Sequence, residues 1–359
     1  MLVVGGGPAG STAARITSRD GLDTLLLERD FSYVKPCGGG IPSTAFTELG
    51  IPAQEAVKHV QALRVVSPGG NELQIKLDGG SIAIVNRGSF DHALRKEAEK
   101  SGARVLRAEF RRFVDIGRTV SAQVLMGQSF GETTVKADYV IAADGVNSRV
   151  RAALQMKPFP AVFTVSEKIK EKTDACEFWF GASHAPRCYS WVFPQEEGAS
   201  AGTGAFGHIG LKSLWNDFVT KRRLTSSGSL KGYRIPVWQG NLYNSGRILF
   251  AGDAAGQVMP FTCEGIYYSM KSGEYAASAV LAGKTGDYRR QWEKRFRTRF
   301  LLMKQLWTYF LKSDDRAEKI IQLHQSPEVQ EMSMALWLRK DLSKKSLLSY
   351  LKVFRRFLS

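Results

Sequence analysis

The stretch that decides the fold is residues 1–28, MLVVGGGPAGSTAARITSRDGLDTLLLE. The apolar segment Leu2–Val4 runs directly into Gly5-x-Gly7-x-x-Gly10, and residues Pro8–Arg19 suit a helix. A second apolar segment, Thr24–Glu28, ends on a carboxylate. This order predicts a β-strand, a helix and a second β-strand, with the glycines in the first turn.

The three spaced glycines serve a chemical purpose in such a unit. They let the backbone turn sharply, let a pyrophosphate approach the helix N-terminus, and let the helix pack closely on the strand. Glu28 lies eighteen residues after Gly10, where a carboxylate accepts hydrogen bonds from a ribose. A second match, Gly202-x-Gly204-x-x-Gly207, has no acid at that offset, so we interpret it as a glycine-rich strand. The first motif therefore predicts dinucleotide binding without separating NAD from FAD.

Two later segments extend the predicted sheet. Asp138–Ala143 and Arg247–Ala251 are apolar and end in turns that carry an aspartate, Asp144-Gly145 and Gly252-Asp253. Ligands of open α/β sheets bind at the carboxyl ends of the strands, where such carboxylates can accept hydrogen bonds from hydroxyl groups. We therefore expect both turns to line the same nucleotide site.

A second, mostly antiparallel sheet is predicted from strand-like segments outside this unit. These segments are Ala62–Ser67, Glu72–Leu77, Ser81–Asn86, Phe178–Phe180 and Tyr189–Phe193. After Gly283 the strand and turn signals stop, and helical patterning continues to the end of the chain.

Bulk properties exclude several classes of protein. The four cysteines and five histidines have no disulfide-framework or metal-ligand spacing, so no metal site is expected. No apolar run approaches about 18 residues, and the first residues do not resemble a secretory signal, which predicts a cytoplasmic protein. The opening strand is shorter than the usual length of about five or six residues, so whether residues are missing before Met1 stays open.

The glycine motif, Asp144-Gly145 and Gly252-Asp253, in this order, resemble the flavoprotein monooxygenase and reductase group. The resemblance implies an α/β fold with a glutathione-reductase-type, Rossmann-like FAD-binding domain. It also implies that Glu28 holds the ribose, that Asp253 holds the ribityl chain, and that Arg87 lies on the flavin side. The full set of FAD-binding residues that it implies is Gly5, Gly7, Pro8, Ala9, Gly10, Glu28, Arg29, Cys37, Gly38, Gly39, Arg87, Asp144, Gly145, Gly252, Asp253, Pro260, Gly265 and Ile266.

Narrower motifs resemble the geranylgeranyl reductases, particularly those of the chlorophyll and bacteriochlorophyll type. They are the loop Lys35–Pro42 (KPCGGGIP), the strand Tyr189-x-Trp191-x-Phe193-Pro194, and the tail from Ser313 to Leu342. Halogenases of the same fold carry a WxWxIP pattern instead. The chain departs from the family at Gly40, where many members have alanine, and at Phe261-Thr262-Cys263, where small residues are usual.

This resemblance implies the domain arrangement. We expect a discontinuous FAD-binding domain (residues 1–60, 87–150 and 240–283), an interleaved substrate-binding β-sheet domain (61–86 and 151–239) and a helical C-terminal cap (284–359).

The resemblance also implies FAD-dependent reduction of isolated C=C bonds in a geranylgeranyl chain, carried by geranylgeranyl diphosphate or by a geranylgeranylated pigment. Tyr189, Trp191 and Phe193 are the expected substrate-binding residues, and Cys37 or a water near it is the expected proton donor. From the residues alone, the aromatic stripe favours a core strand and Cys37 favours an inert buried thiol. NADPH or ferredoxin is the expected reductant, while the oligomeric state and the substrate carrier stay open. Reduction of another polyprenyl lipid or quinone side chain, aromatic monooxygenation and non-catalytic flavin binding are the alternatives.

The net charge of +16 is concentrated toward the C-terminus. Residues 284–359 contain 18 Lys and Arg against 8 Asp and Glu, a net charge of +10. No nucleic-acid motif accompanies this charge, so we expect salt-sensitive peripheral contact with the inner face of an anionic membrane. The alternative is a structural cap that packs its aromatic side chains on the rest of the protein. These aromatic residues are Trp292, Phe296, Phe300, Trp307, Tyr309, Phe310, Phe354 and Phe357.

Overall fold

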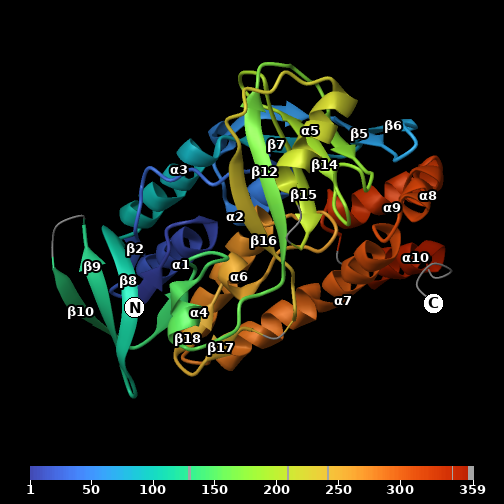
Figure 1. Ribbon diagram of the computed structural model, residues 1–359. Coiled ribbons are helices and arrows are strands. Elements are labelled where there is room, and N and C mark those ends of the chain that lie inside the picture. The colour runs from blue at the N-terminus through green and yellow to red at the C-terminus, as the bar shows by residue number, and fades with distance from the viewer. Residues whose placement is uncertain (128–130, 208–209, 241, 342, 355–359) are drawn as a thin grey trace. The chain divides into compact units, whose positions relative to one another are not determined.

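The computed structural model describes residues 1–127, 131–207, 210–240, 242–341 and 343–354 (Figure 1). The chain forms two compact units, each built from three segments. The first unit contains Met1–Val34, Gly88–Pro160 and Ile235–Thr298, and the second contains Lys35–Arg87, Ala161–Arg234 and Arg299–Ser359. This division differs from the proposed domains at several boundaries, and two of the differences are large. Residues 35–60 group with the second unit, and the C-terminal helices are divided between the units.

An eight-stranded sheet organises the first unit, in the order β10-β9-β8-β2-β1-β11-β18-β17. The five strands β8, β2, β1, β11 and β18 run parallel, which is the arrangement of a dinucleotide-binding sheet. The strands are β1 (Leu2–Val4), β2 (Leu25–Glu28), β8 (Arg104–Ile116), β9 (Val120–Met126), β10 (Glu132–Ala137), β11 (Val140–Ala142), β17 (Asn244–Ser245) and β18 (Ile248–Phe250).

The predicted strand–helix–strand unit at the N-terminus is confirmed. Helix α1 spans Pro8–Arg19 and begins with a proline, whose fixed φ and missing N–H suit a first helical position. Helix α6 packs so closely on α1 that a Cβ on Gly273 would lie 2.2 Å from the Ala9 carbonyl oxygen. The other helices of this unit are α3 (Arg87–Lys100, with Arg87 in the second unit), α4 (Arg149–Ala153), α6 (Ile266–Leu281), the 3-10 turn η2 (Gly252–Ala255) and the first part of α7 (Gly286–Phe310).

Two sheets form the second unit. The larger has the order β16-β12-β15-β14-β13-β5-β6; its pairs β12–β15, β15–β14, β14–β13 and β5–β6 are antiparallel, and β13 and β5 pair in parallel. The smaller has the order β3-β7-β4, so the prediction that Ser81–Asn86 joins the larger sheet is wrong. The strands are β3 (Gly40–Pro42), β4 (Ala56–Val60), β5 (Ala62–Val66), β6 (Glu72–Lys76), β7 (Ile82–Val85), β12 (Ala161–Ile169), β13 (Cys176–Trp179), β14 (Ser190–Pro194), β15 (Ala199–Phe206) and β16 (Lys231–Pro236).

The helices of the second unit cover these sheets with apolar side chains. Trp215 and Phe218 of α5 pack in a core with Trp179 and Val192, while Met334 of α9 and Leu338, directly after this helix, pack in a second core. The helices are α2 (Ser43–Leu49), the 3-10 turn η1 (Ala53–Glu55), α5 (Leu211–Arg222), α8 (Asp314–His324), α9 (Pro327–Trp337) and α10 (Lys344–Phe354). Within the described residues, every helix is too short or too polar to cross a membrane.

The aromatic residues of the C-terminal segment are packed inside. Side chains that are at most 8% exposed are Trp292, Phe296, Phe300, Trp307, Phe310 and Phe354. Tyr309 is half-buried, and Phe357 lies outside the described residues. The helical spacing of these aromatics therefore reflects core packing.

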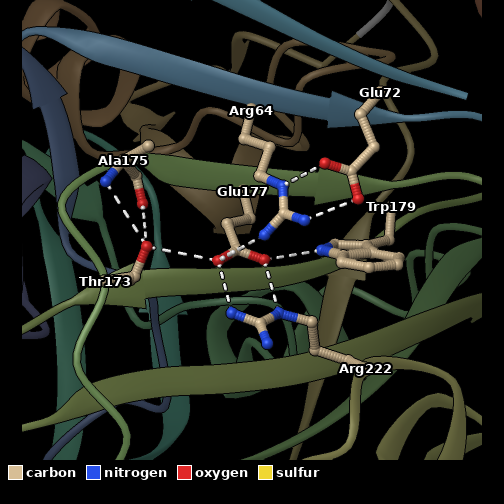
Figure 2. Close-up of polar contacts among 7 residues, drawn as sticks. All are labelled: Arg64, Glu72, Thr173, Ala175, Glu177, Trp179 and Arg222. Atoms are coloured by element: carbon tan, nitrogen blue, oxygen red, sulfur yellow. Dashed lines mark hydrogen bonds and ion pairs between the residues drawn. The ribbon is translucent and has the colours of Figure 1, made fainter.

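A buried carboxylate crosslinks the large sheet of the second unit to α5 (Figure 2). Glu177 of β13 accepts two hydrogen bonds of 2.8 Å from the Arg222 guanidinium and one of 2.8 Å from the Trp179 indole. Arg64 of β5 lies 3.7 Å from the same carboxylate and pairs with Glu72. Burial opposes ionisation of Glu177, but these hydrogen bonds and the charges of both arginines lower its pKa.

Candidate functional site

The carboxyl edge of the parallel sheet brings the predicted nucleotide turns together within the first unit. Gly5 follows β1, Asp144 follows β11 and Gly252 follows β18, while Glu28 ends β2. Backbone hydrogen bonds hold this edge in register, with the Gly5 amide donating to Leu27 at 2.8 Å. The predicted gathering of these turns at one edge is what the structure displays.

The glycines of the first turn have no room for side chains at two positions. A Cβ on Gly10 would lie 1.9 Å from the Gly5 carbonyl oxygen, and one on Gly5 would lie 2.4 Å from the Ala143 carbonyl oxygen. A Cβ on Gly7 would meet no protein atom within 4 Å. The backbone is therefore packed tightly at Gly5 and Gly10 and open at Gly7, beside the N-terminus of α1, where a pyrophosphate would approach. Pro8 and Ala9 form the first turn of that helix.

Glu28 is positioned by backbone donors on both sides. Its Oε2 accepts a hydrogen bond of 2.8 Å from the Gly6 amide, and its Oε1 accepts one of 3.0 Å from the Asp30 amide. Carboxylate oxygens have further lone pairs, so Glu28 can also accept from ribose hydroxyls. Arg29 lies next to it with an exposed side chain.

Asp144 carries a buried acceptor at the same edge. Its Oδ2 accepts a hydrogen bond of 3.1 Å from the Val150 amide, whereas its Oδ1 is buried and finds no partner in the described part of the chain. Burial raises the pKa of this carboxyl above its usual range. Gly145 follows with a positive φ of 80°, which turns the chain away from the sheet.

The Gly252-Asp253 turn lies beside the start of α6. Asp253 is 7% exposed, and its Oδ1 lies 3.7 Å from the position of a Cβ on Gly265, the residue that precedes α6. The Gly252 amide donates to the Ser272 hydroxyl at 2.8 Å. Pro260 is buried in the loop between them, and Ile266 is the first residue of α6.

The remaining predicted FAD residues lie in the second unit. Arg87 begins α3 and is 6% exposed. The Cys37 thiol is half-buried and accepts a hydrogen bond of 3.3 Å from the Gly39 amide. The Gly38 carbonyl accepts from Gln195 at 3.0 Å, which ties the loop to the end of β14. Gly39 has a φ of +77°, and a Cβ there would lie 2.3 Å from the Val85 carbonyl oxygen.

The aromatic strand forms one wall of a ring cluster in the second unit. The Phe178 ring lies 5.2 Å from both Tyr189 and Phe193, and Tyr189 lies 6.5 Å from Trp191. Glycines make room for these rings, since a Cβ on Gly38 would approach Phe193 to 2.6 Å and one on Gly202 would approach Trp191 to 2.3 Å. Gly202 lies in β15, which confirms the strand interpretation of the second glycine motif.

Three features fit an extended dinucleotide: the tight backbone turn at Gly5, Gly7 and Gly10 (the glycine cradle), the Glu28 carboxylate held by two backbone amides, and the buried Oδ1 of Asp144. The model of the FAD binding domain family matches residues 1–292. A geranylgeranyl diphosphate reductase from Rhodobacter capsulatus is 34% identical over 98% of this chain and 94% of its own. The chain belongs to the geranylgeranyl reductase family. FAD is accordingly its cofactor.

A further relative and a solved structure are also similar to this chain over nearly its whole length. A digeranylgeranylglycerophospholipid reductase from Methanocaldococcus jannaschii is 29% identical over 98% of this chain and 97% of its own. The crystal structure of a geranylgeranyl bacteriochlorophyll reductase-like protein from Thermoplasma acidophilum superposes with a TM-score of 0.83 and 24% identity, covering 99% of this chain and 97% of the other. This superposition supports the fold.

Two buried arginines in the FAD-binding unit were missed by the sequence interpretation. Arg95 of α3 donates to the Gly6 carbonyl at 3.2 Å, beside the glycine cradle. Arg151 of α4 donates to the Val146 carbonyl at 2.6 Å and to the Ala254 carbonyl at 3.1 Å, so it joins the turns that carry Asp144 and Asp253. Arg95 follows Arg87 and Asp91 at helical spacing, which is the signal that could have found it.

Proposed function

We propose that this chain uses FAD to reduce isolated C=C bonds in a geranylgeranyl chain. The observation that carries the proposal is the family relationship over nearly the whole chain, including the segments of both units. The glycine cradle and the acceptors on Glu28, Asp144 and Asp253 support the role of the first unit in holding FAD. The aromatic wall at Tyr189, Trp191 and Phe193 supports prenyl binding by the second unit.

Reduction of an isolated alkene needs a hydride on one carbon and a proton on the other. FAD, when bound and reduced, supplies the hydride. An unactivated alkene is a poor electrophile, so the proton must be held ready at the second carbon in a dry, apolar site. We assign that proton to Cys37 or to a water beside it. Gly38 and Gly39 bring the Cys37 backbone close to β7 and β14, where its thiol is positioned by the Gly39 amide.

The prenyl chain would lie against the rings of β13 and β14. Flat aromatic faces without charged groups bind an apolar chain and exclude water. The Trp191 indole N–H is buried and has no partner among the described residues, so it offers one donor within this apolar wall.

The electron donor is assigned to NADPH, with ferredoxin as the alternative. Gly202 and Gly204 of the second glycine motif lie in β15 and not in a nucleotide-binding turn. We therefore assign NADPH as a reductant that binds this chain transiently, without a second dinucleotide-binding fold. Anaerobic stopped-flow mixing should bleach the flavin absorbance with NADPH. Bleaching with reduced ferredoxin alone would assign the other donor.

Product analysis tests the proposed function. The FAD-loaded protein is incubated anaerobically with a reductant and with geranylgeranyl diphosphate, a geranylgeranylated pigment or a digeranylgeranyl glycerol lipid, and products are measured by mass spectrometry. A gain of two hydrogens per reduced bond is expected, and the preferred carrier identifies the substrate. The glycerol lipid is included because of the named activity of the Methanocaldococcus relative. Absence of saturated product from all three would contradict the proposal, as would hydroxylation of an aromatic compound in a separate aerobic incubation.

We also propose peripheral attachment to the inner face of an anionic membrane. Since the C-terminal aromatics are packed inside, the contact would come from exposed basic side chains such as Lys294, Lys312 and Lys319. Exposed Leu301 and Leu348 add apolar surface. Basic residues near an anionic surface contribute about 1 kcal/mol each.

A further inference from the structure

Arg299 of α7 is a buried cation in the second unit. Its side chain and backbone together are 4% exposed. Its Nη2 donates a hydrogen bond of 2.6 Å to the Asp341 carbonyl oxygen. Its Nε and Nη1 are buried and have no hydrogen-bond partner in the described part of the chain.

A guanidinium in this position calls for an anion. Arginine stays protonated in proteins, so it cannot relieve its burial by losing a proton. Buried charges in proteins are paired or coordinated, and the Asp341 carbonyl provides only one neutral acceptor for five N–H donors. The Asp341 carboxylate accepts from the Ser343 amide at 2.8 Å and from its hydroxyl at 3.2 Å, which turns it toward Ser343.

A second cation, Lys340, lies in the turn of residues 338–341, which follows α9 and contains Asp341. Lys340 precedes Asp341, is 6% exposed and has a φ of +53° in the left-handed region. Non-glycine residues adopt that conformation at a cost, and such strain is frequent where a side chain must be placed for binding. The turn is fixed to the rest of the second unit, since the Leu338 carbonyl accepts a hydrogen bond of 2.8 Å from the Thr44 hydroxyl.

The same turn begins at Leu338, which is buried in an apolar cluster of the second unit. Met334, Trp337 and Leu338 share one apolar cluster with Phe178 and Phe193. Two peptide units separate Leu338 from Lys340, which is at most about 7 Å of chain. The segment that meets the Arg299 guanidinium is therefore continuous with an apolar cluster of the second unit, and a ligand with an anionic head and an apolar tail presents both kinds of group.

We propose that Arg299 binds a phosphate or diphosphate group. Planar guanidinium donors match phosphate oxygens and can bind two of them at once. Two sources share this chemistry, a prenyl diphosphate and NADPH. The anion site stands independently of the reductase activity, whereas its assignment to a prenyl diphosphate rests on the proposed function.

Calorimetric titration of the FAD-loaded full chain with inorganic pyrophosphate tests the site. Arg299→Met should weaken pyrophosphate binding by at least about tenfold, with FAD content unchanged. Arg299→Lys keeps the positive charge but loses the planar guanidinium that can bind two phosphate oxygens at once, so pyrophosphate binding should weaken by about threefold to tenfold. Arg297→Met is the matched control because Arg297 is an exposed arginine two residues earlier on α7, and it should bind as the wild type does.

Parallel titrations with dimethylallyl diphosphate and NADP⁺ distinguish the two sources, since Arg299→Met should lose affinity for the one that uses the site. Equal pyrophosphate binding by Arg299→Met, Arg297→Met and the wild type would overturn the proposal, as would loss of FAD from Arg299→Met. If Arg299→Met fails to fold, unchanged affinity in Arg299→Lys overturns the proposal and weakened affinity supports it. If the protein binds pyrophosphate through Arg299 but reduces no prenyl substrate, the anion site is supported and the proposed reductase function is contradicted.

Discussion

Single glycines in the first turn make separable contributions to folding and to FAD binding. Because a Cβ on Gly10 would collide with the Gly5 carbonyl, Gly10→Val should abolish the flavin spectrum and lower the melting temperature. Gly7 faces open space, so Gly7→Ala should keep the melting temperature of the FAD-free protein while weakening FAD binding by at least about tenfold. Absorbance at flavin wavelengths and thermal unfolding measure the two effects.

Gly286→Ala provides the control for these variants. A Cβ on Gly286 also meets no protein atom within 4 Å, and this residue begins α7 away from the glycine motif. It should retain full FAD content. If Gly7→Ala binds FAD as tightly as Gly286→Ala does, the pyrophosphate does not approach at Gly7.

Cys37 is the second residue with a specific expected effect. Cys37→Ala should retain FAD and lower alkene reduction by about 10²-fold or more, which is the lower end of the general-acid scale. Cys263→Ala is the matched control, because Cys263 is also half-buried but lies in the first unit. Product formation is measured under single-turnover conditions. Equal turnover in both variants would leave Cys37 as a packing residue.

The location of a site residue could be predicted from the sequence only where that residue belongs to a motif with fixed spacing. The glycines, Glu28, Asp144 and Asp253 follow strands in a fixed order, so their shared location could be predicted. Arg151 and Arg299 act through tertiary contacts between segments far apart in the chain, and a buried arginine has the same local sequence as an exposed one.

Among the secondary-structure elements, β13 and α5 are joined by the Glu177 pair (Figure 2). The pKa of Glu177 is lower in the folded protein than the unfolded value of about 4.3, so its contribution to stability is complete above that pH. This contribution is lost as the pH falls through the folded pKa. Glu177→Gln should therefore lower the free energy of unfolding by about 3–5 kcal/mol at pH 7, and the difference from wild type should shrink below about pH 4.

Glu72→Gln is the control for this element pair, because Glu72 bonds the same Arg64 from a half-exposed position. Its cost should stay below about 1 kcal/mol. Chemical denaturation followed by circular dichroism at several pH values measures both. A pH-independent difference between Glu177→Gln and wild type would show that the carboxylate charge is not what stabilises the sheet.

The strand Leu2–Val4, a buried and uninterrupted apolar run, and the helix Pro8–Arg19, which begins within the glycine motif, were both predicted with the bounds that the structure has. The three antiparallel strands β8, β9 and β10 (teal to green in Figure 1) were not predicted, because β8 reads RVLRAEFRRFVDI and its many arginines obscure the strand pattern. The strand β7 was recognised, but its sheet was not. Sheet membership depends on pairing partners far away in the chain, such as β3 for β7.

For the protein as a whole, the net charge of +16 predicts salt-sensitive membrane binding. The chain should sediment with anionic vesicles at low ionic strength and be released at high salt, because exposed charges are screened beyond about 10 Å at 0.1 M. Neutral vesicles are the control. Replacement of Lys294, Lys312 and Lys319 by glutamine should reduce binding at low salt. Protein that stays in the supernatant with anionic vesicles would assign this charge to another partner.

The interleaving of the two units governs how the chain can be made. Val3 pairs with Ile141, and Ile141 pairs with Leu249. A ribosome adding about 5–20 residues per second needs on the order of ten seconds to deliver the first of these partners. During that delay the apolar N-terminal strand is a nascent, half-paired segment that a chaperone can bind. The five crossings of the chain between the units also mean that neither unit can be expressed as one continuous fragment.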